Sequence, residues 1–246
     1  MDRLIYTAMT GAKHILEQQA TTSHNLANTS TTGFRAQLDS FRAVPVISDG
    51  LPTRAFVVDA TVGTDFSTGA LQMTGRSLDV AVQGKGWLVV QQPDGSEAYT
   101  RSGSLKLNEN GVLQTQTGLN VMGDTGPITI PPDINLSIGA DGTISSVPNT
   151  GQMNAVNVIG QLKLVNPDEN NLVRGDDGLF KTKDGVPAEK DPNVAVADGM
   201  LENSNVNIVD AMVSMINLGR AFEMQMKLLQ NAESNATKAD QILALS

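Results

Sequence analysis

Residues 23–34, SHNLANTSTTGF, stand where the first pattern of the chain ends and a different pattern begins. Before this stretch, apolar residues recur at helical spacing from about residue 3 to about residue 28. Within it, Asn28 and the hydroxyl residues that follow can hydrogen-bond the unpaired backbone groups of a helix end. Gly33 can adopt the left-handed conformation that redirects a chain. The stretch predicts either an ordinary helix end with a polar loop or a joint between two domains.

Beyond this stretch, the pattern changes from the period of a helix to that of strands. Short runs rich in Val, Leu and Ile are separated by turn signals such as Asn110-Gly111 and Asp141-Gly142. Frequent turn signals of this kind are typical of antiparallel strands joined by hairpins. We therefore expect one all-β domain over residues 76–195, with antiparallel strands in a barrel-like or sandwich-like arrangement.

A second helical pattern occupies the chain from about residue 207 to about residue 244. Its apolar positions follow one another in alternating steps of three and four residues, which is typical of a coiled-coil seam. These positions are Met212, Met215, Gly219, Phe222, Met226 and Leu229. After Leu229 the seam continues through Ala232 and Ala236, so one step of three replaces a step of four. This shift predicts a stammer, which locally overwinds a coiled coil.

Both helical stripes are narrow and rich in Ala and Met, so a single helix cannot bury either stripe by itself. The simplest partner for the N-terminal helix is the C-terminal helix, in an antiparallel coiled-coil pair that brings the chain ends together. We expect the remaining apolar surface to be buried by other subunits.

The expected fold class is therefore mixed α and β, with long terminal helices and a central all-β domain. Residues 1–30 and 207–246 are expected to form a terminal helical domain. Residues 31–75 and 196–206 are expected to be extended connecting segments, and residues 76–195 to be the β domain.

The composition argues against several classes of function. The chain has 246 residues, a net charge of −9 and only 4% aromatic residues, which argues against binding to nucleic acid or to anionic lipid. It has no cysteine, so disulfides, thiolate metal sites and cysteine nucleophiles are ruled out. The first residues lack the apolar segment of a secretory signal, and no window approaches the roughly 18 apolar residues of a membrane span. We expect a soluble acidic protein with no nucleic acid partner and no direct membrane insertion.

Three short motifs could carry chemistry, but each has a simpler interpretation. GKGW, residues 84–87, lacks the first glycine and the final Ser or Thr of a P-loop, and is interpreted as a turn before a strand that buries Trp87. RGD, residues 174–176, lies in a turn-rich stretch. His14 and His24 lie on one helix roughly 15 Å apart, too far for one metal ion. We therefore expect no catalytic residue, no cofactor and no metal, and we do not expect an enzyme.

Four segments carry a resemblance that covers nearly the whole chain. NLANTSTTGFR ends the first helix, LDVAVQGKGWLVV and AYTRSGSL lie in the centre, and ENSNVNIVDAMVSMINLGRAFEMQMKLL begins the last helix. In this order they resemble the flagellar rod and hook family of axial proteins. The segments IYTAMTGA, GFRAQLDSFRAVPV and RAFEMQMK are most similar to proximal-rod members of that family.

The resemblance implies a structural function and a location. Proteins of this family are exported unfolded through the flagellar type III apparatus, without a cleaved signal peptide. They polymerise in helical order under a growing cap and form the drive shaft across the periplasm. The implied partners are copies of the chain itself, proximal and distal rod neighbours, the export apparatus and the rod cap. A distal-rod or hook subunit is the alternative within the family, and a β-rich adhesin or scaffold module is the alternative outside it.

The resemblance and the two helical stripes together predict an assembly interface on the terminal helices and the joint. The predicted interface residues are Leu4, Ile5, Ala8, Met9, Ala12, Ile15, Leu16, Asn25, Leu26, Asn28, Gly33, Phe34, Met212, Met215, Gly219, Phe222, Met226, Leu229, Ala236 and Leu243.

Overall fold

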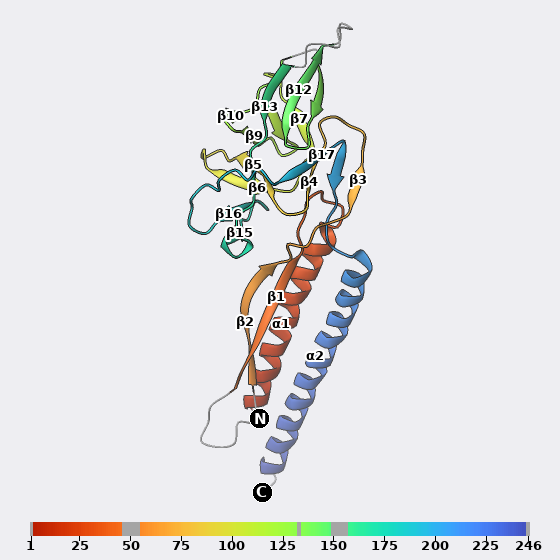
Figure 1. Cartoon of the computed structure of the whole chain (residues 1–246). Coiled ribbons are helices and arrows are strands. Elements are labelled where there is room, and N and C mark those ends of the chain that lie inside the picture. Colours follow the sequence, from red (N-terminus) through yellow and green to blue (C-terminus); the bar gives the residue numbers. More distant parts are fainter. Residues whose placement is uncertain (1, 46–54, 132–133, 149–156, 245–246) are drawn as a thin grey trace. The chain divides into compact units, whose positions relative to one another are not determined.

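The computed structural model describes residues 2–45, 55–131, 134–148 and 157–244 (Figure 1). The chain divides into two compact units, which we call the helical unit and the β unit. The helical unit comprises residues 1–29, 36–65 and 206–246, and the β unit comprises residues 30–35 and 66–205.

The helical unit contains two long helices and one β-hairpin. Helix α1 (Asp2–Ala27) and helix α2 (Ile208–Ala244) lie side by side and run antiparallel (Figure 1). Their 26 and 37 residues correspond to lengths of roughly 39 Å and 56 Å. Strands β1 (Gln37–Pro45) and β2 (Ala55–Thr64) pair antiparallel and pack on α1.

Polar side chains cap the C-terminal end of α1 and the N-terminal end of α2. At the end of α1, Asn28 Nδ2 donates to the carbonyl of His24 and Thr29 Oγ1 donates to the carbonyl of Leu26. At the start of α2, Asn207 Oδ1 accepts a hydrogen bond of 3.0 Å from the amide of Val209. These bonds satisfy backbone groups that a helix end leaves unpaired.

The contact between the two helices follows small side chains on α1. Ala8 and Ala12 are the buried side chains among the described residues of α1. A Cβ atom placed on Gly11 would lie 3.4 Å from Gln225 Nε2, so this part of α1 lies against Gln225 of α2. Side chains this small allow the two helix backbones to approach closely.

The less exposed positions of α2 differ from the expected seam. They are Ala211, Met215, Leu218, Gly219, Ala221, Phe222, Gln225, Leu229 and Ala232. The stammer after Leu229 stays a prediction, because the side chain of Ala236 lies outside the described part of the chain. Gln225 was not expected on this face, because the sequence pattern was traced through apolar residues alone, whereas Gln225 faces α1.

The expected connecting segment 31–75 also divides differently. Residues 37–45 and 55–64 form the paired strands β1 and β2 of the helical unit, while residues 30–35 and 66–75 belong to the β unit. A β-bulge between Ser40 and Phe41 interrupts the alternation of side chains along β1, which weakens the strand pattern in the sequence.

The β unit is built from short strands, all paired antiparallel, and one short 3₁₀ turn (Glu169–Asn171). The strands are β3 (Leu71–Met73), β4 (Val80–Gln83), β5 (Trp87–Gln91), β6 (Glu97–Thr100), β7 (Leu105–Leu107), β8 (Leu113–Thr115), β9 (Asn120–Gly123), β10 (Gly126–Pro127), β11 (Ile134–Ile138), β12 (Thr143–Pro148), β13 (Asn157–Gln161), β14 (Leu164–Val165), β15 (Leu172–Arg174), β16 (Phe180–Thr182), β17 (Ala195–Asp198) and β18 (Met200–Glu202).

The largest sheet has nine strands in the order β15-β16-β6-β5-β9-β8-β7, with β10 on β9 and β14 on β5. The smaller sheets are β11-β12-β13, β17-β4 and β18-β3. The path of the largest sheet ends at β15 and β7, so the described strands do not close into a barrel. The barrel-like arrangement that the turn pattern allowed is therefore not formed by them.

Strand β5 is the centre of the β unit because both of its faces are buried. Leu88 and Val90 belong to the larger apolar core, together with side chains from β4, β9 and β12. Trp87 and Val89 point to the other face, where a second core contains Phe180. A strand buried on both faces is expected to read as a continuous apolar run, as WLVV does. No described helix is long and apolar enough to cross a membrane.

Candidate assembly interface

The predicted interface residues of α1 fall on two sides of the helix. Ala8 and Ala12 are buried in the helix pair, and Ile5 and Ile15 are half-buried. Met9 and Leu16 belong to a different side, where each exposes at least half of its surface. Leu26 is half-buried near the end of the helix.

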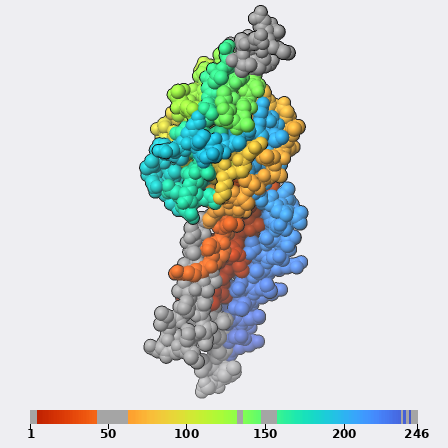
Figure 2. Space-filling view, viewed as in Figure 1, coloured from red at the N-terminus to blue at the C-terminus, as the bar shows by residue number. Residues whose placement is uncertain are grey.

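The predicted residues of α2 divide in the same way. Met215, Gly219, Phe222 and Leu229 are half-buried, whereas Met212 and Met226 are exposed. Figure 2 shows part of the surface of α2, drawn in blue, exposed on one face of the helical unit. The side chains of Leu4, Ala236 and Leu243 lie outside the described part of the chain.

Asn25 fixes the start of the hairpin to α1. Its Nδ2 donates to the carbonyl of Gln37 at 2.8 Å, and its Oδ1 accepts from the amide of Gln37 at 2.9 Å. The carboxamide thereby replaces the partner that a neighbouring strand would offer to Gln37. Thr21 Oγ1 adds a bond of 2.9 Å to Asp39 Oδ1. These residues line an open groove of about 370 Å³ whose other side is formed by Ser214, Asn217 and Leu218 of α2.

The end of the opening stretch, Gly33-Phe34, is anchored inside the β unit. Gly33 has a φ of 70°, and a Cβ atom there would lie 2.3 Å from the carbonyl carbon of Arg101. Only glycine fits a left-handed position this crowded. Phe34 is buried, and the guanidinium of Arg174 lies 4.5 Å from the centre of its ring. Phe34 therefore holds residues 30–35 in the β unit by a cation–π contact.

Sequence reasoning missed the ionic cluster formed by Arg35, Arg101 and Glu202, all of which are almost fully buried. Arg101 Nη1 lies 3.0 Å from Glu202 Oε2, and Arg35 Nη2 lies 2.7 Å from Glu202 Oε1. The second contact is an ion pair by distance but lacks the alignment of a hydrogen bond. The amide of Gly69 donates to Glu202 Oε1, and the amide of Gly33 donates to the carbonyl of Glu202.

This cluster holds two positive charges against one negative charge. Burial lowers the pKa of Arg101; Glu202 raises it and Arg35 lowers it further. Arg101 also donates to the carbonyls of Val82 and Gly84, which disperses part of its charge. Glu202 is thus the carboxylate that contacts both buried guanidinium groups and offsets the cost of burying their charges. A lone acid carries no periodic signal in a sequence, so only the fold shows that it is buried.

Three family models match the chain, and they fall on the segments just described. The model described as "Flagella basal body rod protein" matches residues 5–35, which include α1 and the joint. "Flagellar hook protein FlgE/F/G D1 domain" matches residues 81–146. "Flagellar basal body rod FlgEFG protein C-terminal" matches residues 197–242, which include Glu202 and most of α2.

Full-length relatives point to one branch of these proteins. The flagellar basal-body rod protein FlgF of Escherichia coli (strain K12) is 47% identical, with 100% of both chains covered. FlgF of Salmonella typhimurium is also 47% identical over 100% of both chains. The chain belongs to the FlgF family of flagellar basal-body rod proteins. A related rod protein, FlgG of Buchnera aphidicola subsp. Schizaphis graminum, is 33% identical over 89% of this chain and 92% of its own.

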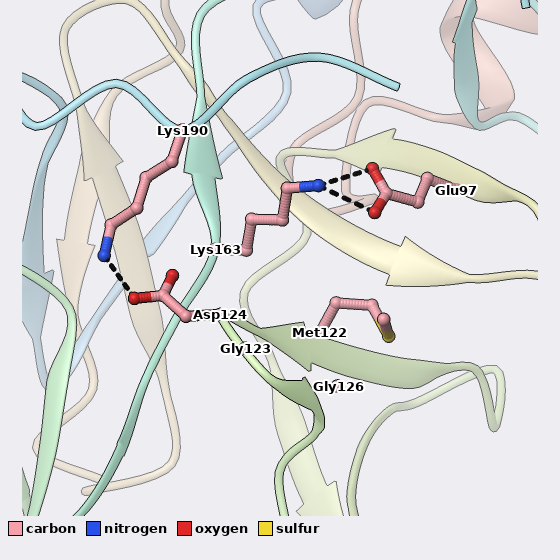
Figure 3. A pocket seen from close by; sticks show the side chains of 7 residues that line it. All are labelled: Glu97, Met122, Gly123, Asp124, Gly126, Lys163 and Lys190. Carbon is pink, nitrogen blue, oxygen red and sulfur yellow. Dashed lines mark hydrogen bonds and ion pairs between the residues drawn. The ribbon is translucent and has the colours of Figure 1, made fainter. Parts of the chain in front are cut away.

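The β unit of this FlgF-family chain also contains a charged pocket of about 310 Å³ (Figure 3). Lys163 Nζ lies 2.7 Å and 2.8 Å from the two carboxylate oxygens of Glu97, and Lys190 Nζ lies 2.5 Å from Asp124 Oδ2. Figure 3 shows both lysines directed at these acids, with Met122 beside them. The charges of the pocket therefore neutralise each other, and the pocket presents no uncompensated group to a ligand.

GKGW and the RGD stretch lie in turns, as their sequences indicated. Gly84 and Gly86 both have positive φ, and the turn that they form leads into β5 with Trp87 buried. In the RGD stretch, the amide of Leu179 donates to Asp177 Oδ1, as in a turn. His14 contacts Glu17 and the ring of Phe41. The described residues contain no group of three or more His, Cys, Asp or Glu that could hold a metal ion.

Proposed function

We propose that this FlgF-family chain is a structural subunit of the proximal part of the flagellar rod, and that it polymerises in helical order as part of the drive shaft. The observation that carries the proposal is the apolar outer side of α2. Val209, Val213 and Ile216 are 67%, 51% and 57% exposed. Large apolar side chains at helical spacing on an exposed face are typical of protein–protein interfaces. The FlgF relatives, which are named as basal-body rod proteins, support the rod as the assembly.

In this proposal α1 and α2 pair as an antiparallel coiled coil, and the predicted interface residues of both helices act in assembly. The half-buried Met215, Phe222 and Leu229 of α2, spaced seven residues apart, support that pairing. The β unit is proposed to be a sandwich-like packing of sheets around its two apolar cores. Residues 1–30 and 207–246 form the inner helical domain of the proposed rod.

The proposed partners are further copies of the chain, proximal and distal rod neighbours, and the export apparatus and rod cap during assembly. The proposed location is the periplasmic rod, reached by export without a cleaved signal peptide. We assign no catalytic role, because the charged pocket is internally neutralised and its lysines are held by acids. No nucleic acid, cofactor or direct membrane insertion enters the proposal.

Quantitative mass spectrometry of isolated basal bodies tests this function. We expect the chain in the rod fraction, in a fixed ratio to the other rod proteins. Cells that lack it should lose motility and contain no complete proximal rod. A distal-rod or hook subunit would instead leave a proximal rod in place when it is deleted. If the chain is absent from basal bodies and motility is normal without it, the proposal is wrong.

A further inference from the structure

Two stripes of exposed side chains, one on each helix, have matching spacing. The α1 outer stripe is Tyr6, Met9, Lys13, Leu16, Ala20 and Ser23, in alternating steps of three and four residues. The α2 outer stripe is Val213, Ile216, Arg220, Glu223, Lys227 and Gln230, with the same alternation. Every one of these side chains is exposed, and neither stripe belongs to the contact between α1 and α2.

The contact between the two helices within one copy gives their register. Gly11 lies against Gln225, and Gln18 and Thr22 line the same groove as Ser214 and Leu218. In this register each position of the α1 outer stripe is level with one position of the α2 outer stripe, from Tyr6 beside Gln230 to Ser23 beside Val213.

We propose that the α1 outer stripe of one copy packs against the α2 outer stripe of a second copy, antiparallel and at the same level. This inference rests on the proposed function, because it names the surfaces through which rod subunits contact each other. The two stripes are different surfaces, so the interface is heterologous. Such an interface leaves one free stripe at each end of a row of subunits and allows the row to continue.

Charge complementarity favours the level register. Lys13 lies opposite Glu223, and its present contact within the copy is the exposed pair with Glu17 at 3.5 Å. Moving the second copy along the helix by one or two heptads in either direction would place Lys13 opposite Ile216, Val209, Gln230 or Thr237. None of these residues is an acid, so only the level register gives the lysine an opposite charge.

Side-chain size favours the same register. The small Ala20 and Ser23 of α1 lie opposite the β-branched Ile216 and Val213 of α2, an alternation that lets two helices approach closely. Leu16 lies opposite Arg220, whose aliphatic stem can cover it while the charged group stays in water. The six levels extend over roughly 26 Å of helix.

Disulfide cross-linking tests the contact directly, because the natural chain has no cysteine. Two single-cysteine variants, Ala20→Cys and Ile216→Cys, carry different tags and are expressed together in cells that lack the natural chain. Basal bodies are isolated and oxidised. We expect a disulfide-linked dimer that contains both tags, since the Cβ atoms of directly opposite residues lie close enough for a disulfide. The matched control is the pair Met9→Cys and Val213→Cys, which would be opposite only after a shift of two heptads.

The outcomes separate this inference from the proposed function. If Met9→Cys and Val213→Cys cross-link while Ala20→Cys and Ile216→Cys do not, the level register is wrong although the chain is a rod subunit. If both pairs are present in basal bodies and neither cross-links, the two stripes do not meet. If the natural chain is absent from basal bodies, the proposed function fails and this inference fails with it.

Charge exchange provides a second test that adds no cysteine. Lys13→Glu and Glu223→Lys should each lower incorporation into basal bodies about two- to fivefold, and the double variant should restore it, because the pair is exposed in the single copy and modest in strength. Lys238→Glu, at an exposed position of α2 outside the stripe, is the control and should have no effect. A double variant that is no better than the worse single variant overturns the pairing of Lys13 with Glu223.

Discussion

Glu202 joins four segments of the β unit through one side chain and its own carbonyl group. It contacts Arg35, Arg101 and the amides of Gly33 and Gly69. The segments that contain Arg35, Gly69 and Glu202 all lie close to points where the chain passes to the helical unit. One carboxylate therefore holds together the parts of the β unit from which these connections leave.

Replacing this carboxylate by an amide should be strongly destabilising. Glu202→Gln keeps the shape of the side chain but leaves two buried guanidinium groups without a counter-charge. Because removal of one partner from a buried ion pair costs about 3–5 kcal/mol, we expect a loss of this size in the free energy of unfolding. Urea unfolding followed by the fluorescence of Trp87, the single tryptophan, measures it. The exposed Glu109→Gln is the control, and equal stability of the two variants would show that the cluster contributes little.

Gly33, in the joint, and Gly75 are two glycines with the same backbone conformation but different space around them, so their substitutions can be compared. Both have a φ near 70°, but a Cβ atom on Gly33 would meet the backbone of Arg101, whereas one on Gly75 would meet nothing within 4 Å. Each substitution by Ala should lower the free energy of unfolding by about 1–2 kcal/mol, because a residue with a Cβ atom disfavours the left-handed conformation. Gly33→Ala should lose about 1–3 kcal/mol more from crowding. Thermal unfolding of the two variants compares them, and similar melting temperatures would mean that the joint has room to move.

At the scale of elements, the existence of both helices and of the antiparallel strands was predictable from period and turn signals. What the sequence could not give was the side of α2 that faces α1, because Gln225 interrupts the apolar pattern at the position where it packs beside Gly11. The β1–β2 hairpin was likewise hidden by its bulge. Glu202 was missed for a third reason, since burial of a charge depends on partners that are remote in sequence.

The same contacts predict that the helix pair is weaker than the β unit in a free subunit. The fully buried side chains of the α1–α2 contact are small, such as Ala8 and Ala12, and its larger apolar side chains, such as Phe222 and Leu229, are only half-buried, whereas Leu88 and Val90 of β5 are almost fully buried. Helices that are not stabilised by packing are marginal in water. In amide hydrogen exchange of a dilute monomer, we expect residues 210–232 to exchange at least about 100-fold faster than β5, which reflects local opening of the less stable unit. Equal protection would indicate that the pair is stable before assembly.

At the scale of the whole molecule, the division into two units predicts the outcome of a truncation. Removal of residues 207–246 deletes α2 but leaves every contact of Glu202 and both apolar cores in place. We expect the shortened chain to remain soluble, with the Trp87 fluorescence of the folded β unit, and to be excluded from basal bodies. Retained incorporation would contradict an assembly role for α2. A β-rich adhesin, by contrast, should keep its ligand binding after the same truncation.

Both ends of the chain belong to the helical unit, so the β unit is an insertion between α1 and α2. The contact of Gly11 with Gln225 joins residues that are roughly 200 positions apart, which makes it one of the least local contacts in the molecule. During synthesis, α1 leaves the ribosome before the β unit and before α2, so it has no helical partner of its own chain until α2 follows. The surface that pairs the helices is therefore completed only after the β unit already has its whole sequence. A growing chain is in this way kept from presenting a finished helix pair to its neighbours before the β unit has been made.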